Sequence, residues 1–230
     1  MIKKILFLFC LCGLSCTSDD IIRSEKTSFY KIYKDIVSSE PTSTPSKELM
    51  KKQSYDKAWL SKFNQPIILL SSLDGKKTAT LVSLGNYKNN LTWVSADGIS
   101  VSFLNGILIA TRGYSQDLME SQQNDLNIIF TRNVKTRSKK YRYINGENQY
   151  MELNFNCSLL AKTNTPSVFF DLTIVTTKFT EICQAGSVNH TNEYYVLPGT
   201  NIVLKSKQWI SEANGSINIY NYYAFQNNLF

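Results

Sequence analysis

The chain has 230 residues, with 25 Lys and Arg against 18 Asp and Glu, and therefore a formal net charge of +7. This length is enough to bury one good core and argues against two full-sized domains. The charge is mildly basic, which excludes a polycationic protein.

The N-terminus carries the pattern of a secretion signal that ends at a lipid-bearing cysteine. Two lysines precede an apolar core, and the small Ser15 precedes Cys16. Signal-processing enzymes read this order, and the apolar core is too short for a membrane-spanning helix. We predict a signal peptide over residues 1–15 and lipidation at Cys16, with ordinary cleavage or an uncleaved anchor as the alternatives.

The segment that follows Cys16 connects the anchor to a globular body. Apolar residues recur at helical spacings from about Ile21 to Val37, which predicts an amphipathic helix. Residues 38–54 contain two prolines and little that could be buried, so they predict a linker. We therefore expect residues 16–54 to tether a single antiparallel β domain over residues 55–230.

Short apolar or alternating runs fill the body, and turn residues separate them. The pairs Asp74-Gly75, Asp97-Gly98 and Asn105-Gly106 predict reversals between strands. A brief helix is predicted over residues 115–122. The predicted strands cover residues 66–71, 78–84, 91–95, 100–104, 107–112, 127–131, 140–144, 149–160, 168–178, 193–196, 202–209 and 216–223. Many short strands at near-regular spacing predict a mainly β fold, an antiparallel β-sandwich or a partly open barrel.

Two cysteines, Cys157 and Cys183, lie in the body, whereas the other three belong to the signal and its cleavage point. Because the protein is expected to be exported, one disulfide is predicted, with two separate buried thiols as the alternative.

Groups that could perform catalysis are scarce. The one histidine, His190, lies in a polar stretch that predicts a surface or turn position, and no metal-ligand spacing or nucleophile elbow accompanies it. Asp171 and Glu181 have no spacing typical of a carboxylate pair. We expect no enzyme, no catalytic residue, no metal and no cofactor.

Basic and aromatic residues are the remaining candidates for binding. A run of cations without an acid spans residues 132–142 and predicts either a solvated loop or edge strand, or a site for an anionic polymer. Lys139, Lys140 and Arg142 are the candidate ligands in that run. Beside it, an exposed aromatic strip would favour an acidic polysaccharide, and its candidate members are Tyr141, Tyr143, Tyr150, Tyr194, Tyr195, Tyr220, Tyr222 and Tyr223. Export argues against nucleic acid as a partner.

Two segments resemble signatures of the YjbF/GfcB family of bacterial lipoproteins, which is associated with exopolysaccharide and group 4 capsule production. The first is TWVSADGISVSFLNGILIATRGYSQDLM, residues 92–119, and the second is FTEICQAGSVNHTNEYYVLPGTNIVLKSKQWI, residues 179–210. The matched positions that have a structural interpretation are Trp93, Gly98, Asn105, Gly106, Gly113, Gln208 and Trp209. Arg112 ends an apolar strand and is expected either to pair with a buried acid or to bind an anionic ligand.

The resemblance implies an all-β lipoprotein of the outer membrane without known catalysis. Thr17 follows Cys16 where an Asp would favour the inner membrane, so the protein is expected to face the periplasm. Capsule or exopolysaccharide export proteins are the implied partners, and an acidic polysaccharide is a candidate ligand. The sequence leaves open dimerisation through a sheet edge, a polysaccharide-modifying enzyme that uses Asp or Glu, and an envelope lipoprotein unrelated to glycans.

Overall fold

The computed structural model describes residues 66–87, 90–123, 130, 135–144, 149–169 and 172–226. Cys16, the predicted helix over 21–37 and the predicted domain boundary at residue 55 lie outside these residues. Among the helices in the described part of the chain, none has the length and apolar character needed to cross a membrane.

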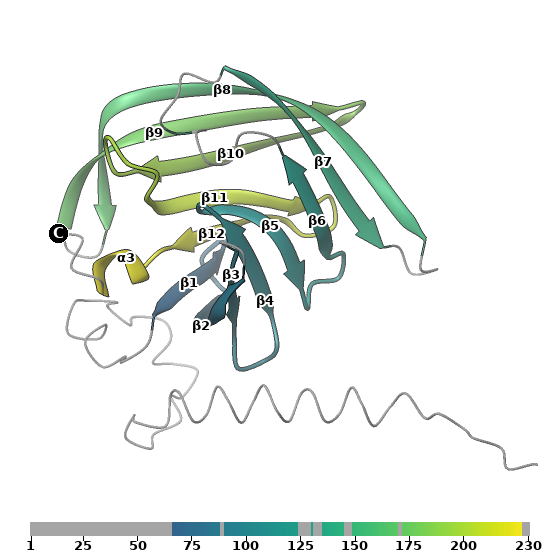
Figure 1. Ribbon diagram of the computed structural model, residues 1–230, viewed down its shortest axis with the longest axis horizontal. Helices are drawn as coiled ribbons and strands as arrows, with labels where there is room; N and C mark the ends of the chain where they lie inside the picture. The colour runs from purple at the N-terminus through teal and green to yellow at the C-terminus, as the bar shows by residue number, and fades with distance from the viewer. Residues whose placement is uncertain are drawn as a thin grey trace, which may run out of the picture.

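The fold is a single antiparallel sheet of twelve strands that curls into a nearly closed barrel (Figure 1). The spatial order is β5-β4-β3-β2-β1-β12-β11-β10-β9-β8-β7-β6. The predicted mainly β, antiparallel fold is confirmed. Of the two predicted forms, the structure has the barrel and not the sandwich. The strands are β1 (Ile67–Ser72), β2 (Thr78–Tyr87), β3 (Asn90–Val94), β4 (Ser100–Leu104), β5 (Ile107–Arg112), β6 (Leu118–Gln123), β7 (Thr136–Ile144), β8 (Tyr150–Phe169), β9 (Leu172–Ala185), β10 (Val188–Val196), β11 (Val203–Ser211) and β12 (Gly215–Tyr220).

The two ends of the sheet, β5 and β6, meet through side chains. The backbone N–H of Leu118 donates to Oγ1 of Thr111 at 2.9 Å, and the guanidinium of Arg112 donates to the carbonyl of Leu118 at 3.3 Å. These bonds satisfy backbone groups that a sheet edge would otherwise leave open, which is how the barrel is closed at this seam.

The barrel interior is the main hydrophobic core. Its residues come from strands all around the sheet and include Ile68, Leu81, Phe103, Leu118 and Phe155. In β7 and β10 buried and less buried residues alternate, as expected for strands with one face toward a core. The regular alternation is why these sequences could be identified as strands.

The predicted helix over residues 115–122 is wrong, because this segment forms a turn and then strand β6. The carboxylate of Asp117 accepts hydrogen bonds from the backbone N–H groups of Gly113, at 2.9 Å, and Tyr114, at 3.1 Å. These bonds hold the turn that leads the chain into β6, which pairs with β7. Tertiary pairing therefore overrides a weak helical pattern.

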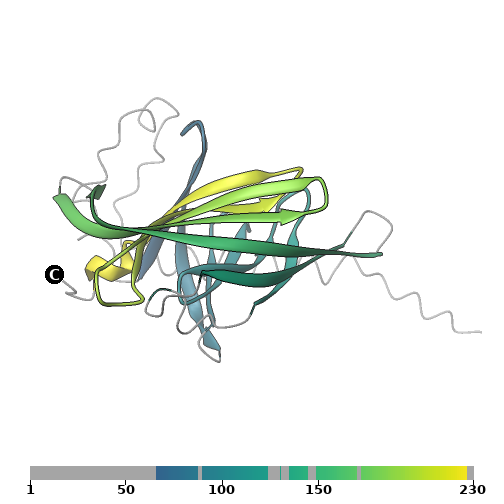
Figure 2. The same cartoon turned by 90° about the horizontal axis from the view of Figure 1, so that it is seen from above.

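Strands β8 and β9 form one long hairpin that extends over the barrel (Figure 2). The sequence predicted a break between residues 160 and 168, where Thr, Asn and Pro are typical of a turn. In the structure β8 continues through that stretch with a register shift between Lys162 and Thr165, where Asn164 adopts a φ of 52°. A bulge thus absorbs the turn residues without ending the strand.

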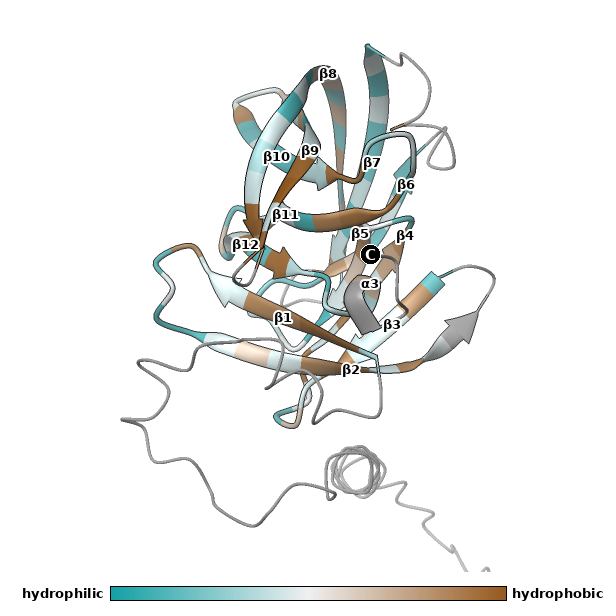
Figure 3. Ribbon diagram, turned by 90° about the vertical axis from the view of Figure 1, so that its left-hand side faces the viewer, coloured by the Kyte–Doolittle hydropathy of each residue, from teal (hydrophilic) through white to brown (hydrophobic). Residues whose placement is uncertain are grey.

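The tip of this hairpin packs on the outer side of the sheet. Phe169 belongs to a second hydrophobic cluster with Ile67 and Leu69 of β1 and with Tyr222, which precedes the short helix α3 (Tyr223–Gln226). The rings of Phe169 and Tyr222 are 5.7 Å apart. Figure 3 shows β1 and α3 on this side of the molecule.

Candidate functional site

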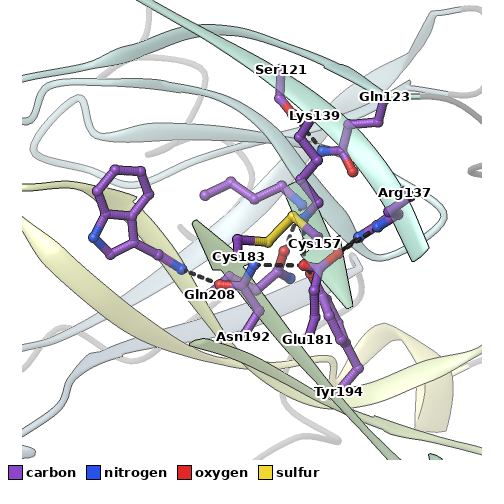
Figure 4. A network of polar contacts seen from close by, with 12 residues as sticks. Ser121, Gln123, Arg137, Lys139, Cys157, Glu181, Cys183, Asn192, Tyr194 and Gln208 are labelled. Atoms are coloured by element: carbon purple, nitrogen blue, oxygen red, sulfur yellow. Dashed lines mark hydrogen bonds and ion pairs between the residues drawn. A yellow bond between two sulfur atoms is a disulfide. The ribbon is translucent and has the colours of Figure 1, made fainter. Parts of the chain in front are cut away.

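A cluster of charged side chains lies inside the barrel, around the carboxylate of Glu181 on β9 (Figure 4). Arg137 and Lys139 on β7 each form an ion pair with it, and the side chains of all three are at most 2 % exposed. On β10, Asn192 donates to Oε2 of Glu181 at 2.8 Å, and the hydroxyl of Tyr194 donates to the same oxygen at 3.3 Å. One carboxylate therefore pairs with two buried cations.

The chemistry of Glu181 is that of a permanent anion. Burial acts to raise its pKa, but the neighbouring Lys139 and Arg137 outweigh burial and hold the pKa at about 2. A carboxylate in this state cannot donate a proton near neutral pH. Its arrangement indicates a structural role in the barrel interior.

The structure corrects the sequence prediction for Lys139. The basic run was interpreted as a solvated segment, yet Lys139 is 2 % exposed and points to Glu181. Alternate residues of β7 face inward, so residues 137 and 139 enter the core while their neighbours remain outside. Lys139 is therefore unavailable to an external anionic ligand.

Lys140 and Arg142 lie outside and are already paired. Arg142 contacts Glu120 at 2.8 Å and Glu152 at 2.6 Å, and Lys140 lies 3.4 Å from Glu152. The two cations and two carboxylates balance, so this group of four residues offers no excess positive charge to an acidic ligand.

His190 is buried rather than exposed as predicted. It is 7 % exposed and stacks on Trp209 with ring centroids 4.4 Å apart, next to Phe155 at 4.7 Å. Neither ring nitrogen has a hydrogen-bond partner within the part of the chain that the structure describes. Burial and the nearby charge of Lys139 lower the pKa of His190 to about 4, so its ring is neutral at pH 7.

Cys157 and Cys183 form a disulfide between β8 and β9. Both are buried, and their sulfur atoms lie within 4.8 Å of a carboxylate oxygen of Glu181. This is the one group of His, Cys, Asp and Glu in the described residues that is compact enough for a metal ion. Because the sulfurs are joined and Glu181 already binds two cations, these residues do not fit a metal site.

Gln208 joins the β4–β5 hairpin to β11 across the interior. Its side-chain oxygen accepts the backbone N–H of Leu108 at 2.8 Å, and its side-chain nitrogen donates to the carbonyl of Gly106 at 2.8 Å. Gly106 has a φ of 78°, and a Cβ there would lie 2.5 Å from Cγ2 of Val203. This contact requires glycine at residue 106 and places the hairpin directly on β11.

The other positions of the family signatures also lie in turns and core. Trp93 is buried, with its ring 6.0 Å from that of Tyr223. Gly98 and Gly113 take positive φ values in turns. Arg112 donates to the carbonyls of Thr111 and Leu118, so it binds the barrel seam instead of a buried acid.

Four of the eight tyrosines predicted to form an exposed aromatic strip are buried. Tyr141, Tyr143, Tyr194 and Tyr222 are at most 4 % exposed and belong to the hydrophobic clusters. They occupy inward positions of strands, or the loop next to α3, which the high tyrosine content alone could not show.

A different set of basic and aromatic residues crosses the outer face of the sheet. Lys178, Tyr195, Lys205 and Tyr220 are successive partners on β9, β10, β11 and β12. The ammonium of Lys205 lies 5.6 Å from the ring centroid of Tyr195 and 5.2 Å from that of Tyr220, and Lys178 lies 5.4 Å from Tyr195. We call these four residues the Lys–Tyr row.

The Lys–Tyr row is partly solvent-accessible and carries positive charge. All four side chains are half-buried, and Glu193 pairs with Lys178 at 2.6 Å, which leaves the charge of Lys205 unbalanced within the row. Tyrosine faces and ammonium groups are the chemistry that binds acidic sugars. Tyr195 and Tyr220 were candidates for the predicted strip. Their placement beside Lys178 and Lys205 was not predicted, because the four residues are 10 to 17 residues apart and only strand pairing aligns them.

A cavity of about 60 Å³ lies between β3–β4 and β11–β12, next to Trp93, Phe103 and Tyr223. This volume holds a few water molecules and is too small for a sugar ring. The outer face, rather than this cavity, is therefore the candidate site for a glycan.

Comparisons with known proteins agree with this architecture. A family model described as "Group 4 capsule polysaccharide lipoprotein gfcB, YjbF" matches residues 44–220. Among solved structures, the crystal structure of the hypothetical lipoprotein YmcC from Escherichia coli (K12) matches with a TM-score of 0.62 and 13 % identity, over 78 % of this chain and 96 % of that chain. At this identity the likeness shows the fold alone. No match was found among curated proteins.

Proposed function

Since the chain belongs to the YjbF family of group 4 capsule polysaccharide lipoproteins, we propose that it is a non-enzymatic accessory to the assembly or export of a capsule or exopolysaccharide. The match to this family over most of the β domain is the observation that carries the proposal. The charged cluster of the barrel interior is consistent with it, because Arg137, Lys139 and Glu181 are paired with one another and buried away from any external substrate.

In this proposal a lipid on Cys16 anchors the protein to the outer membrane and the β domain faces the periplasm. The supporting features are the signal sequence and Thr17 after the cysteine. From that position the domain would act through export proteins and through weak contacts with the polysaccharide.

Glycan contact is assigned to the Lys–Tyr row. Its ammonium groups would pair with sugar carboxylates or phosphates, and the tyrosine rings would contact the apolar faces of sugar rings. The half-buried lysines are held by the tyrosines, so less side-chain entropy is lost on binding than at a freely exposed lysine.

Gene deletion and complementation test the role in the cell. We expect the deletion strain to lose surface polysaccharide and the full chain to restore it, whereas a Cys16→Ala chain should not. Normal surface polysaccharide in the deletion strain would favour an envelope lipoprotein unrelated to glycans.

Binding of the purified protein to the cell's own acidic polysaccharide tests the Lys–Tyr row. Lys205→Gln and Tyr195→Ala should each weaken binding by about three- to tenfold, the loss expected for one charge or one stacked ring. Lys140→Gln is the matched control, because Lys140 is an outward cation on β7, outside the row, and is already paired. Shortening of the polysaccharide chains during incubation would instead indicate an enzyme.

A further inference from the structure

The end of the β8–β9 hairpin exposes apolar side chains. Val168 is 66 % exposed, and Leu172 and Val175 are each 52 % exposed. These residues lie opposite Thr173, Phe169 and Pro166 in the hairpin register. From residue 163 to residue 177 the sequence contains a single charged side chain, Asp171.

The exposed side chains are on an anchored part of the structure. Phe169, on the other side of the hairpin, is 2 % exposed and packs in the cluster with Tyr222 and α3. Thr176 is fully buried, and its hydroxyl donates to the carbonyl of Thr165 at 2.8 Å. The hairpin tip is therefore held against the domain by one face, and its other face presents Val168 and Val175 outward. Leu172 is on the same face as its partner Phe169 but lies at the end of the hairpin, where it is exposed.

The chain segment that leads to Cys16 leaves the domain at the same end. Strand β1 begins at Ile67, and Ile67 belongs to the hydrophobic cluster that holds Phe169. Figure 1 shows the end of β8, helix α3 and the start of β1 on the left side of the molecule. The chain that comes from Cys16 therefore enters the described domain at the end that carries the apolar tip.

Charge next to the tip complements a lipid surface. Lys162 on β8 lies just behind the bulge and is exposed, while its opposite partner Lys178 on β9 is half-buried and paired with Glu193. An apolar tip followed by lysines is the arrangement that interfacial segments use, with apolar side chains below the headgroups and ammonium groups at the phosphates.

We propose that the tip of the β8–β9 hairpin, through Val168, Leu172 and Val175, rests in the surface of the membrane that holds the lipid anchor. The inference depends on the anchoring at Cys16 in the proposed function. It assigns an orientation to the domain: the hairpin tip and α3 face the lipid, and the β1–β2 turn faces away.

Depth-dependent quenching tests this orientation. The full lipidated protein would carry Leu172→Cys with a fluorophore, reconstituted in vesicles of phosphatidylethanolamine and phosphatidylglycerol that contain brominated lipid. Leu73→Cys is the matched control, because Leu73 is 54 % exposed and follows β1 at the end opposite Ile67. Quenching at residue 172 should exceed that at residue 73 by at least about twofold, since interfacial segments lie about 5–10 Å deep.

Three results would overturn the inference. Equal quenching at the two sites on a lipidated, vesicle-bound protein would mean that the tip does not contact lipid, and would leave the proposed function intact. The fluorescence at residue 172 could instead shift without vesicles, by an amount that rises with protein concentration. That result would show that the tip contacts a second copy of this chain and not lipid. A mass spectrum that shows no lipid on Cys16 would overturn both this inference and the proposed anchoring.

A second variant checks the contact independently. The double change Val168→Asp and Leu172→Asp should abolish the vesicle binding that remains in a Cys16→Ala chain, while Leu73→Asp should leave it unchanged. Both changes are at exposed positions, so circular dichroism should show an unchanged fold. Equal binding by the three proteins would contradict the proposal.

Discussion

At the residue scale, this protein places the same chemical group in two environments. Glu181 accepts Arg137 and Lys139 inside the barrel, and Glu152 accepts Arg142 and Lys140 on its surface. The sequence spacing of the two cation pairs on β7 is similar, so burial alone separates a structural cluster from a surface network.

We expect Glu181→Gln to destabilise the protein by about 3 kcal/mol or more, because it leaves two buried cations without a carboxylate. Glu152→Gln, the matched control, should leave the urea midpoint nearly unchanged because water solvates its partners. Urea unfolding at pH 7 measures both. Equal losses for the two variants would contradict the assignment of Glu181 to a buried cluster.

The lowered pKa of His190 predicts that the stability of the protein depends on pH. Its pKa is about 4 in the folded protein and near 6.5 when unfolded, so the unfolded chain binds a proton first as pH falls. Stability should therefore be fully present above pH 6.5 and decrease by about 3 kcal/mol as the pH falls to 4.

His190→Phe removes this titration and keeps an aromatic ring on Trp209. Chemical unfolding at pH 7 and pH 4 should show a smaller difference for the variant than for the natural protein. The same loss in both would mean that other groups cause the acid sensitivity.

At the element scale, the β4–β5 hairpin depends on close contact with β11. Asn105-Gly106 was identified as a turn from the sequence, and the turn is where it was expected. The sequence did not show that this turn also contacts β11. Gly106 lies against Val203, and its carbonyl accepts a hydrogen bond from Gln208, about 100 residues later in the chain. No local pattern contains this information, because the contact exists only after the barrel forms.

Gly106→Ala should therefore lower the free energy of unfolding by clearly more than the same substitution at a positive-φ glycine that has no close neighbours. Gly75 is the matched control, with a φ of 68° and nothing within 4 Å of a Cβ. We expect about 1 kcal/mol for Gly75→Ala and about 3 kcal/mol or more for Gly106→Ala, measured by thermal unfolding. Similar shifts in melting temperature would show that Val203 yields to the added methyl.

At the scale of the whole molecule, the disulfide joins the two strands of the long hairpin within the core. Cys157 and Cys183 are 4 % and 0 % exposed. Reductant should not reach them while the protein is folded.

We expect alkylation after mild reduction to label neither cysteine of the folded domain, and both once urea is added. The free energy of unfolding of the double variant Cys157→Ala and Cys183→Ala should be lower by about 3 kcal/mol, because the bridge restricts the unfolded chain. Rapid labelling of the folded protein would contradict the buried placement.

The sequence by itself determined the class of fold, most strand positions and the family, because these depend on local periodicity, turn residues and short motifs. The signal peptide and the lipidation of Cys16 stay predictions. Only the tertiary structure decided which side chains are buried together. Lys139 and His190 were assigned to the surface and lie in the core. The alignment of Tyr195 and Tyr220 with two lysines and the apolar hairpin tip were not predicted. The physical reason is that strand pairing aligns residues distant in sequence, and the side of the sheet that a residue faces depends on register and bulges.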